Sequence, residues 1–169
     1  MNTPAIDAKP AVNDSSSLQC LAFQAGGEVF AIDIRNVREI IQYAGITVVP
    51  QMPAFLRGVI NLRGAVVPVI DVNGRFCGAR SSIGKRSSVI VLNVTAEGTS
   101  VALGLLVDAV SEVIAISQQS IEPPPQFGGA TPREFILGMG KVGGEFVAII
   151  DPDRALNIEE MALLADQGP

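Results

Sequence analysis

Hydrophobic residues fall in short runs separated by turns that carry glycine or proline. Within residues 55–76, one apolar run covers 58–62 and another covers 65–70, with Arg63-Gly64 between them. β-Branched runs on either side of a glycine-bearing tip predict a β-hairpin. Pro68 has no backbone N–H to donate, so we expect the second strand to be an edge strand, or to be bulged, at that point.

This hairpin pattern occurs twice in the chain. Residues 135–156 repeat the apolar positions of residues 55–76 at an offset of 80, so that Phe55 matches Phe135 and Asp71 matches Asp151. Upstream, residues 36–41 match residues 109–114 at an offset of 73. We infer two copies of a unit of about 70 residues, each a series of short strands, with a longer connection in the second copy.

The two copies keep their apolar positions but differ at three polar ones. Arg57, Asn61 and Arg63 of the first copy correspond to Leu137, Lys141 and Gly143 of the second. The fold is therefore expected not to require these polar side chains. We interpret them as candidates for contact with a partner.

The domain is expected to cover residues 18–164, between a disordered polar tail at 1–17 and a short tail at 165–169. The copies would be barrels at about 18–80 and 87–156, with crossing elements between them. Residues 88–94 and 100–107 are almost continuously apolar and need cover on both faces, which two packed small barrels would supply. Short helical turns are expected after Asp33, Asp71 and Asp151, and a C-terminal helix with Asn157 and Glu160 as its capping box.

Composition narrows the class of partner and compartment. The net charge is −5 and the 12 basic residues are scattered, which argues against nucleic acid as a partner. Cys20 and Cys77 are too few for a disulfide framework, and a reducing compartment fits them best. We see no signal peptide and no apolar run near the roughly 20 residues that cross a bilayer. These features predict a soluble cytoplasmic protein.

Several kinds of chemistry are excluded by residue type. The chain has no histidine, which removes Ser-His-Asp triads, histidine phosphotransfer and histidine-ligated metals. A G-x-G-x-x-G pattern at 138–143 precedes another predicted strand, so we interpret it as a tight hairpin and not as a nucleotide site. Four aspartates end apolar runs and could serve acid-base chemistry, although capping of backbone N–H groups is the ordinary role of such residues. They are Asp33, Asp71, Asp108 and Asp151.

Five segments carry a resemblance to a known family. They read VFAIDIRNVREII, MPAFLRGVINLRGAVVPVIDV, GLLVDAVSEV, IEPPPQF and EEMALL, and the likeness runs from about residue 18 to residue 164. Together they resemble the CheW family of bacterial chemotaxis coupling proteins. The resemblance implies a mainly β fold of two five-stranded SH3-like barrels about a shared core, with short helices and a C-terminal helix. It also implies an adaptor without enzymatic activity, cofactor or metal.

The resemblance further implies two contact surfaces. Receptor-binding residues would be Val37, Glu39, Ile40, Gly58, Asn61, Arg63 and Gly64. From its place at a hairpin tip we expect Arg63 to pair with Glu39, because guanidinium and carboxylate suit a bidentate contact; the alternative is a solvated turn arginine. Contacts to the kinase, or within array rings, would involve Ile121, Glu122, Pro125 and Phe127. The match is looser at residues 71–75, where the family commonly has a Leu-Arg helical start.

The partners implied are the cytoplasmic tip of methyl-accepting chemoreceptors, the regulatory domain of a CheA-type histidine kinase and other copies of the chain in array rings. The protein would reach the inner face of the membrane only indirectly, through receptors. Two alternatives stay open at this point. One is a barrel that binds a small ligand, and the other is a small β-barrel enzyme that depends on carboxylates.

Overall fold

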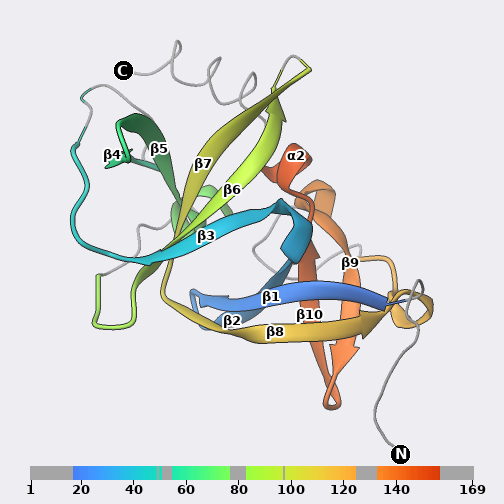
Figure 1. Ribbon diagram of the computed structural model, residues 1–169. Coiled ribbons are helices and arrows are strands. Elements are labelled where there is room, and N and C mark those ends of the chain that lie inside the picture. The colour runs from blue at the N-terminus through green and yellow to red at the C-terminus, as the bar shows by residue number, and fades with distance from the viewer. Residues whose placement is uncertain are drawn as a thin grey trace, which may run out of the picture.

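The computed structural model describes residues 17–48, 50, 55–76, 83–96, 98–124 and 133–156, and confirms a mainly β fold (Figure 1). The strands are β1 (Ser17–Ala25), β2 (Glu28–Asp33), β3 (Val37–Gln42), β4 (Leu56–Leu62), β5 (Ala65–Asp71), β6 (Ser88–Ala96), β7 (Thr99–Val107), β8 (Ala109–Ser117), β9 (Ile136–Val142) and β10 (Glu145–Ile150). The short helices are η3 (Ile34–Asn36), α1 (Val72–Phe76), η4 (Gln118–Ser120), η5 (Arg133–Phe135) and α2 (Pro152–Ala155). Ser17, expected to end the N-terminal tail of residues 1–17, instead begins β1. The rest of that tail, Cys77, the C-terminal helix with Asn157 and Glu160, and the short tail at 165–169 lie outside the described residues.

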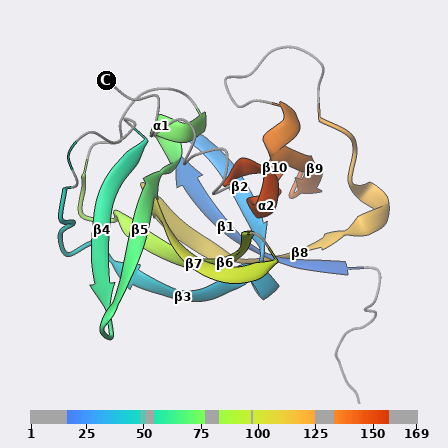
Figure 2. The same ribbon diagram turned by 90° about the horizontal axis from the view of Figure 1, so that it is seen from above.

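The strands form two five-stranded sheets that exchange strands between the sequence copies. One sheet has the order β8-β1-β2-β10-β9 and the other β3-β6-β7-β5-β4. Each therefore combines two strands that open one copy with three strands that close the other (Figures 1 and 2). The expectation that residues of about 18–80 and 87–156 each build their own barrel is corrected by this strand order. The repeat predicts that each copy is a series of short strands, but it does not tell which strands pair.

The β6–β7 hairpin is covered on both faces, as its apolar sequence predicts. In β6, Ile90 and Leu92 contribute to the core shared by both sheets, whereas Val89 and Val91 pack into a second cluster within their own sheet. Phe23 and Phe30 of the other sheet enter the shared core and stack at 5.7 Å. Because successive side chains of a strand point to opposite faces, one run serves both clusters.

The expectation for Pro68 is confirmed by the register of its strand. Pro68 pairs with Val59 of β4, but β5 begins to pair with β7 only at Val69. The strand thus has a single neighbour where proline stands, and the missing N–H interrupts no ladder.

Arg75 of α1 links the two copies at the centre of the molecule. Its guanidinium carbon lies 5.3 Å from the ring centroid of Phe55 and 4.5 Å from that of Phe135, the matching phenylalanines of the two copies. Its Nε donates to the carbonyl oxygen of Ala155 at 2.8 Å. Cation–π contacts on both rings stabilise the junction between the copies.

Candidate functional site

The tip of the β4–β5 hairpin holds Arg63 in a conformation that suits glycine. Arg63 has a φ of 52° and Gly64 a φ of 89°, the two positive values of a type I′ turn. Asn61 Oδ1 accepts a hydrogen bond from the Gly64 N–H at 2.9 Å. The matching β9–β10 tip uses Gly143 and Gly144, at 59° and 85°. A left-handed conformation costs a non-glycine residue about 1–2 kcal/mol, so Arg63 stands there at the expense of stability.

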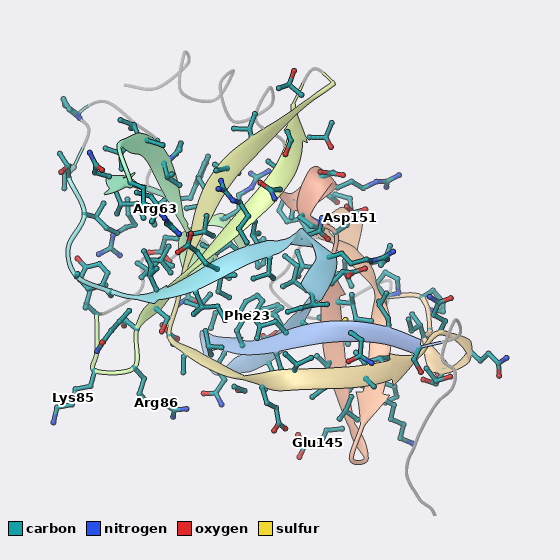
Figure 3. The ribbon with its side chains drawn as sticks, viewed as in Figure 1. Phe23, Arg63, Lys85, Arg86, Glu145 and Asp151 are labelled. Carbon is teal, nitrogen blue, oxygen red and sulfur yellow. The ribbon has the colours of Figure 1, made fainter. Side chains whose placement is uncertain are left out.

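The Arg63 side chain crosses to the opposite edge of its sheet. Its Nη1 and Nη2 donate to Oε2 of Glu39 at 2.9 and 2.7 Å, which confirms the expected pair, with both nitrogens on one carboxylate oxygen. Glu39 lies in β3, and β3 and β4 are the two ends of the strand order. Side-chain exposure is 68% for Arg63 and 26% for Glu39. The pair therefore connects the two edge strands at the surface, where Figure 3 labels Arg63.

Between these edges lies an open seam, by which we mean the gap between β3 and β4. It holds a cavity of about 310 Å³. At one end Thr47 and Val59 exchange two backbone hydrogen bonds of 2.9 Å, and the Glu39–Arg63 pair lies beyond the other end. The walls include Ile41, Gln42, Val59, Ile60, Asn61 and Val89.

The equivalent seam of the other sheet, between β8 and β9, is filled. A Cβ built on Gly140 would lie 2.8 Å from Cγ2 of Ile116, so only glycine allows β9 to approach β8 so closely. The residue that matches Gly140 in the first copy is Ile60, and its branched side chain does not allow the same approach. Sequence reasoning missed the seam, although the Ile60 to Gly140 difference between the copies was the available signal.

The remaining residues of the predicted receptor set have different roles. Ile40 is exposed, on the opposite face of β3 from Glu39, and Val37 packs against the shared core. Gly58 is buried with a φ of 146°, and a Cβ there would clash with the carbonyl oxygen of Thr47. The missing side chain at Gly58 therefore makes room for Thr47, whose backbone closes one end of the seam. In the second copy, the counterpart Gly138 makes room in the same way for the backbone of Glu122.

The second predicted surface is only partly described. Glu122 pairs with Met139 through backbone hydrogen bonds of 2.9 and 2.7 Å, and its side chain is exposed. Ile121 is half-buried and packs against the core cluster of its own sheet. Pro125 and Phe127 lie outside the described residues.

A family model described as CheW-like domain matches residues 19–160. The chain belongs to the CheW family. It is 38% identical over 144 residues to the chemotaxis protein CheW of Klebsiella aerogenes, covering 85% of this chain and 84% of the relative. It is 30% identical to that of Treponema pallidum, covering 92% and 91%.

A solved CheW-family structure, the scaffolding protein TtCheW of Thermoanaerobacter tengcongensis, shares the fold. It matches with a TM-score of 0.71 and 36% identity over 79% of this chain and 88% of that one. The family consists of chemotaxis scaffold proteins, which confirms the expectation that the chain is not an enzyme.

In this CheW-family chain the four candidate aspartates serve the backbone. Each accepts a hydrogen bond from a main-chain N–H: Asp33 from Arg35, Asp71 from Asn73 and Gly74, Asp108 from Gly26, and Asp151 from Arg154. The Arg35 side chain also holds the pKa of the Asp33 carboxyl below its ordinary value. Capping therefore accounts for these residues, which removes the observation that favoured a carboxylate-dependent enzyme.

Arg57 corrects the interpretation that the fold does not need the polar residues of the first copy. Its Nη1 lies 2.9 Å from Oδ2 of Asp71, with side-chain exposures of 14% and 0%. Removing one partner of such a buried pair leaves an uncompensated charge, so Arg57 is part of the fold.

The described residues offer neither a metal-binding cluster nor a membrane-spanning helix. Within those ranges there is no group of three or more cysteine, aspartate or glutamate side chains placed to hold a metal ion. None of the helices in the described part is long and apolar enough to cross a membrane.

Proposed function

We propose that this chain is an adaptor that couples the cytoplasmic tip of chemoreceptors to the regulatory domain of a CheA-type histidine kinase. The observation that carries the proposal is Arg63. It occupies a strained turn position that the second copy gives to glycine, and it pairs across an open seam that the second copy fills. Stability does not explain this choice, whereas recognition of a partner does.

The receptor surface is proposed to centre on the open seam and its rim. Asn61 and Arg63 offer polar groups there, and the seam adds apolar walls from Ile41 and Ile60. Most of the Arg63 side chain is exposed, so its guanidinium can donate to a second carboxylate, or to the carbonyl groups at a helix C-terminus, while it stays paired with Glu39. Val37 and Gly58 support this surface from beneath.

The kinase surface is proposed to include Ile121, Glu122, Pro125 and Phe127, the same segment that would serve contacts between copies in array rings. The backbone of Glu122 is fixed by its two hydrogen bonds to Met139, and its side chain is exposed, which suits a polar contact at a rim.

Coupling follows because the proposed receptor surface and the proposed kinase surface belong to the same domain. The shared core and the exchange of strands tie the two sheets together. Once one partner is bound, the second contact is effectively intramolecular, so modest affinities can maintain an array. We place the chain in the cytoplasm, recruited to the membrane by receptors. A signal passes only if the contacts differ between two receptor states.

The test is co-sedimentation with receptor-bearing membranes and a CheA-type kinase, combined with an assay of receptor-dependent kinase autophosphorylation. The wild-type chain should sediment with both partners and raise phosphorylation. Arg63→Gly keeps the turn and should lose the membranes, and Glu122→Ala should lose the kinase alone. A wild-type chain that joins neither partner would refute the function, and an Arg63→Gly variant that sediments normally would refute the receptor surface.

A further inference from the structure

The two copies share one backbone frame around Arg57 and its counterpart Leu137. Each residue sits at a register shift: Leu56 and Gly58 pair with successive residues of β5, and the matching residues of β9 pair with successive residues of β10. The backbone N–H of Asp71 donates to the carbonyl oxygen of Phe55 at 2.6 Å. In the second copy Asp151 donates in the same way to Phe135, at 3.0 Å. A side chain at position 137 is therefore placed relative to Asp151 as the Arg57 side chain is placed relative to Asp71.

In the first copy this frame is filled by an arginine. The guanidinium of Arg57 contacts the buried Asp71 carboxylate at 2.9 Å, and Asp71 has no exposed surface. The carboxylate thereby gains both a charge partner and a hydrogen-bond donor.

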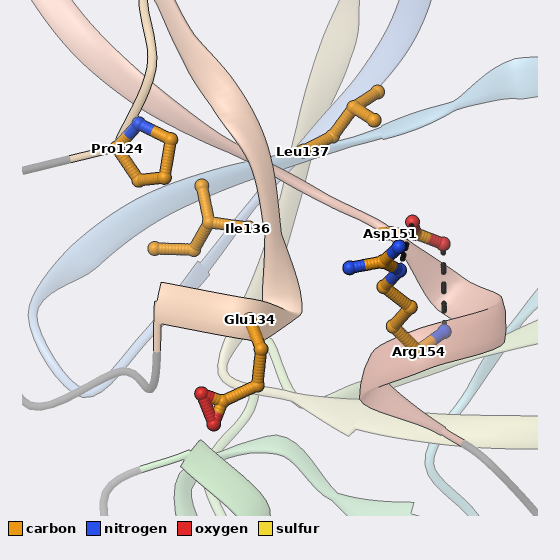
Figure 4. A pocket seen from close by; sticks show the side chains of 6 residues that line it. All are labelled: Pro124, Glu134, Ile136, Leu137, Asp151 and Arg154. Carbon is orange, nitrogen blue, oxygen red and sulfur yellow. Dashed lines mark hydrogen bonds and ion pairs between the residues drawn. The ribbon is translucent and has the colours of Figure 1, made fainter.

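In the second copy the corresponding space is a hollow. Its volume is about 540 Å³, and it is lined by Pro124, Glu134, Ile136, Leu137, Asp151 and Arg154 (Figure 4). Leu137 is 56% exposed and supplies no charge to Asp151.

The charges in the hollow are incompletely matched. Arg154 Nε lies 3.8 Å from Asp151 Oδ2, and the Arg154 side chain is 73% exposed. Figure 4 shows the two groups at one wall, where Arg154 comes from α2 and not from the strand. Glu134 makes no ion pair with any residue in the described ranges. The lining therefore carries two carboxylates and one cation.

We propose that this hollow binds an arginine side chain presented by a partner protein. The planar guanidinium would take the place that Arg57 takes in the first copy, with its two parallel N–H groups on the Asp151 carboxylate. Pro124, Ile136 and Leu137 provide an apolar wall for the aliphatic stem. The site does not depend on the receptor and kinase roles proposed above, because it rests only on the comparison of the two copies.

The test is an NMR titration of the full ¹⁵N-labelled chain with the peptide acetyl-Gly-Arg-Gly-amide in the millimolar range. The amide resonances of Leu137, Asp151 and Arg154 should shift saturably. The peptide with citrulline in place of arginine, which keeps the shape without the charge, should bind at least about tenfold more weakly. Lack of a saturable shift, or equal binding of the citrulline peptide, would overturn the proposal.

Variants separate this site from binding elsewhere on the acidic surface. Asp151→Asn keeps a good capping residue and should weaken arginine binding at least about tenfold, whereas Glu145→Gln, at the far end of the same hairpin, should leave it unchanged (Figure 3). Leu137→Arg recreates the first copy and should fill the hollow and abolish binding. Unchanged binding by either Asp151→Asn or Leu137→Arg would contradict the assignment.

Discussion

Replacing Arg63 with glycine is expected to change the free energy of unfolding by less than about 1 kcal/mol. The substitution removes the strain of a left-handed conformation, which costs a non-glycine residue about 1–2 kcal/mol. Part of this gain is offset because glycine has more conformational freedom in the unfolded chain. The substitution also removes an ion pair whose arginine is mostly exposed, and such pairs contribute at most about 1 kcal/mol. The gain and the loss are of similar size, so they nearly cancel.

Arg63→Ala separates the two contributions, because alanine loses the ion pair and keeps the strain. We expect it to be less stable than Arg63→Gly by about 1 kcal/mol. The matched control is Gly143→Ala in the second copy, where φ is 59° and an added Cβ meets nothing within 4 Å. That variant adds strain without a clash and should lose about 1 kcal/mol.

The assay is urea unfolding followed by far-ultraviolet circular dichroism, since the chain has no tryptophan. The three variants and the wild type should share one m-value and differ only in midpoint. If Arg63→Ala proved as stable as Arg63→Gly, the positive φ would carry no cost. The argument that Arg63 is retained for recognition would then fail.

Three further outcomes follow from the core and the backbone. Arg57→Ala should destabilise by about 3–5 kcal/mol in the same urea assay, because the buried Asp71 carboxylate loses the guanidinium of Arg57. Gly58→Ala should lower the unfolding midpoint sharply, since its Cβ meets the Thr47 carbonyl oxygen. Burial raises the pKa of the Cys20 thiol to about 11, so its stabilising effect is complete below pH 9 and declines by about 1.4 kcal/mol per pH unit up to pH 11. Cys20→Ala should abolish this decline, which urea titrations across that range would measure.

Local features of the fold could be predicted from the sequence because they depend on neighbouring residues. The Arg63-Gly64 tip, the capping by Asp33 and Asp151, and the single-neighbour position of Pro68 all rest on backbone preferences of a few residues. The exchange of strands between the copies does not rest on such local preferences, so it could not be predicted in this way. Apolar runs of similar composition are interchangeable as partners, so alternation predicts strands without telling which strands pair.

The candidate site shows the same division. The Glu39–Arg63 pair could be anticipated from charge and position, but the open seam depends on how closely β3 and β4 approach each other. The approach is decided by packing at Ile60, and the contrast becomes visible only beside Ile116 and Gly140 of the filled seam. Cavities arise from such mismatches of volume, which a linear pattern does not encode.

Differences between duplicated halves are informative only when the partner of each residue is known. Arg57 and Arg63 are both absent from the second copy, yet the first neutralises the buried Asp71 and the second holds a strained turn at the surface. Losing the first arginine is tolerated in the second copy because Asp151 is less buried there and has Arg154 nearby. Losing the second arginine relieves strain and removes an ion pair whose arginine is mostly exposed, and these two effects nearly cancel. Arg63, the strained residue, is therefore the arginine whose retention is explained by a partner. The hollow beside Leu137 is where a partner's arginine can supply the guanidinium that Arg57 supplies in the first copy.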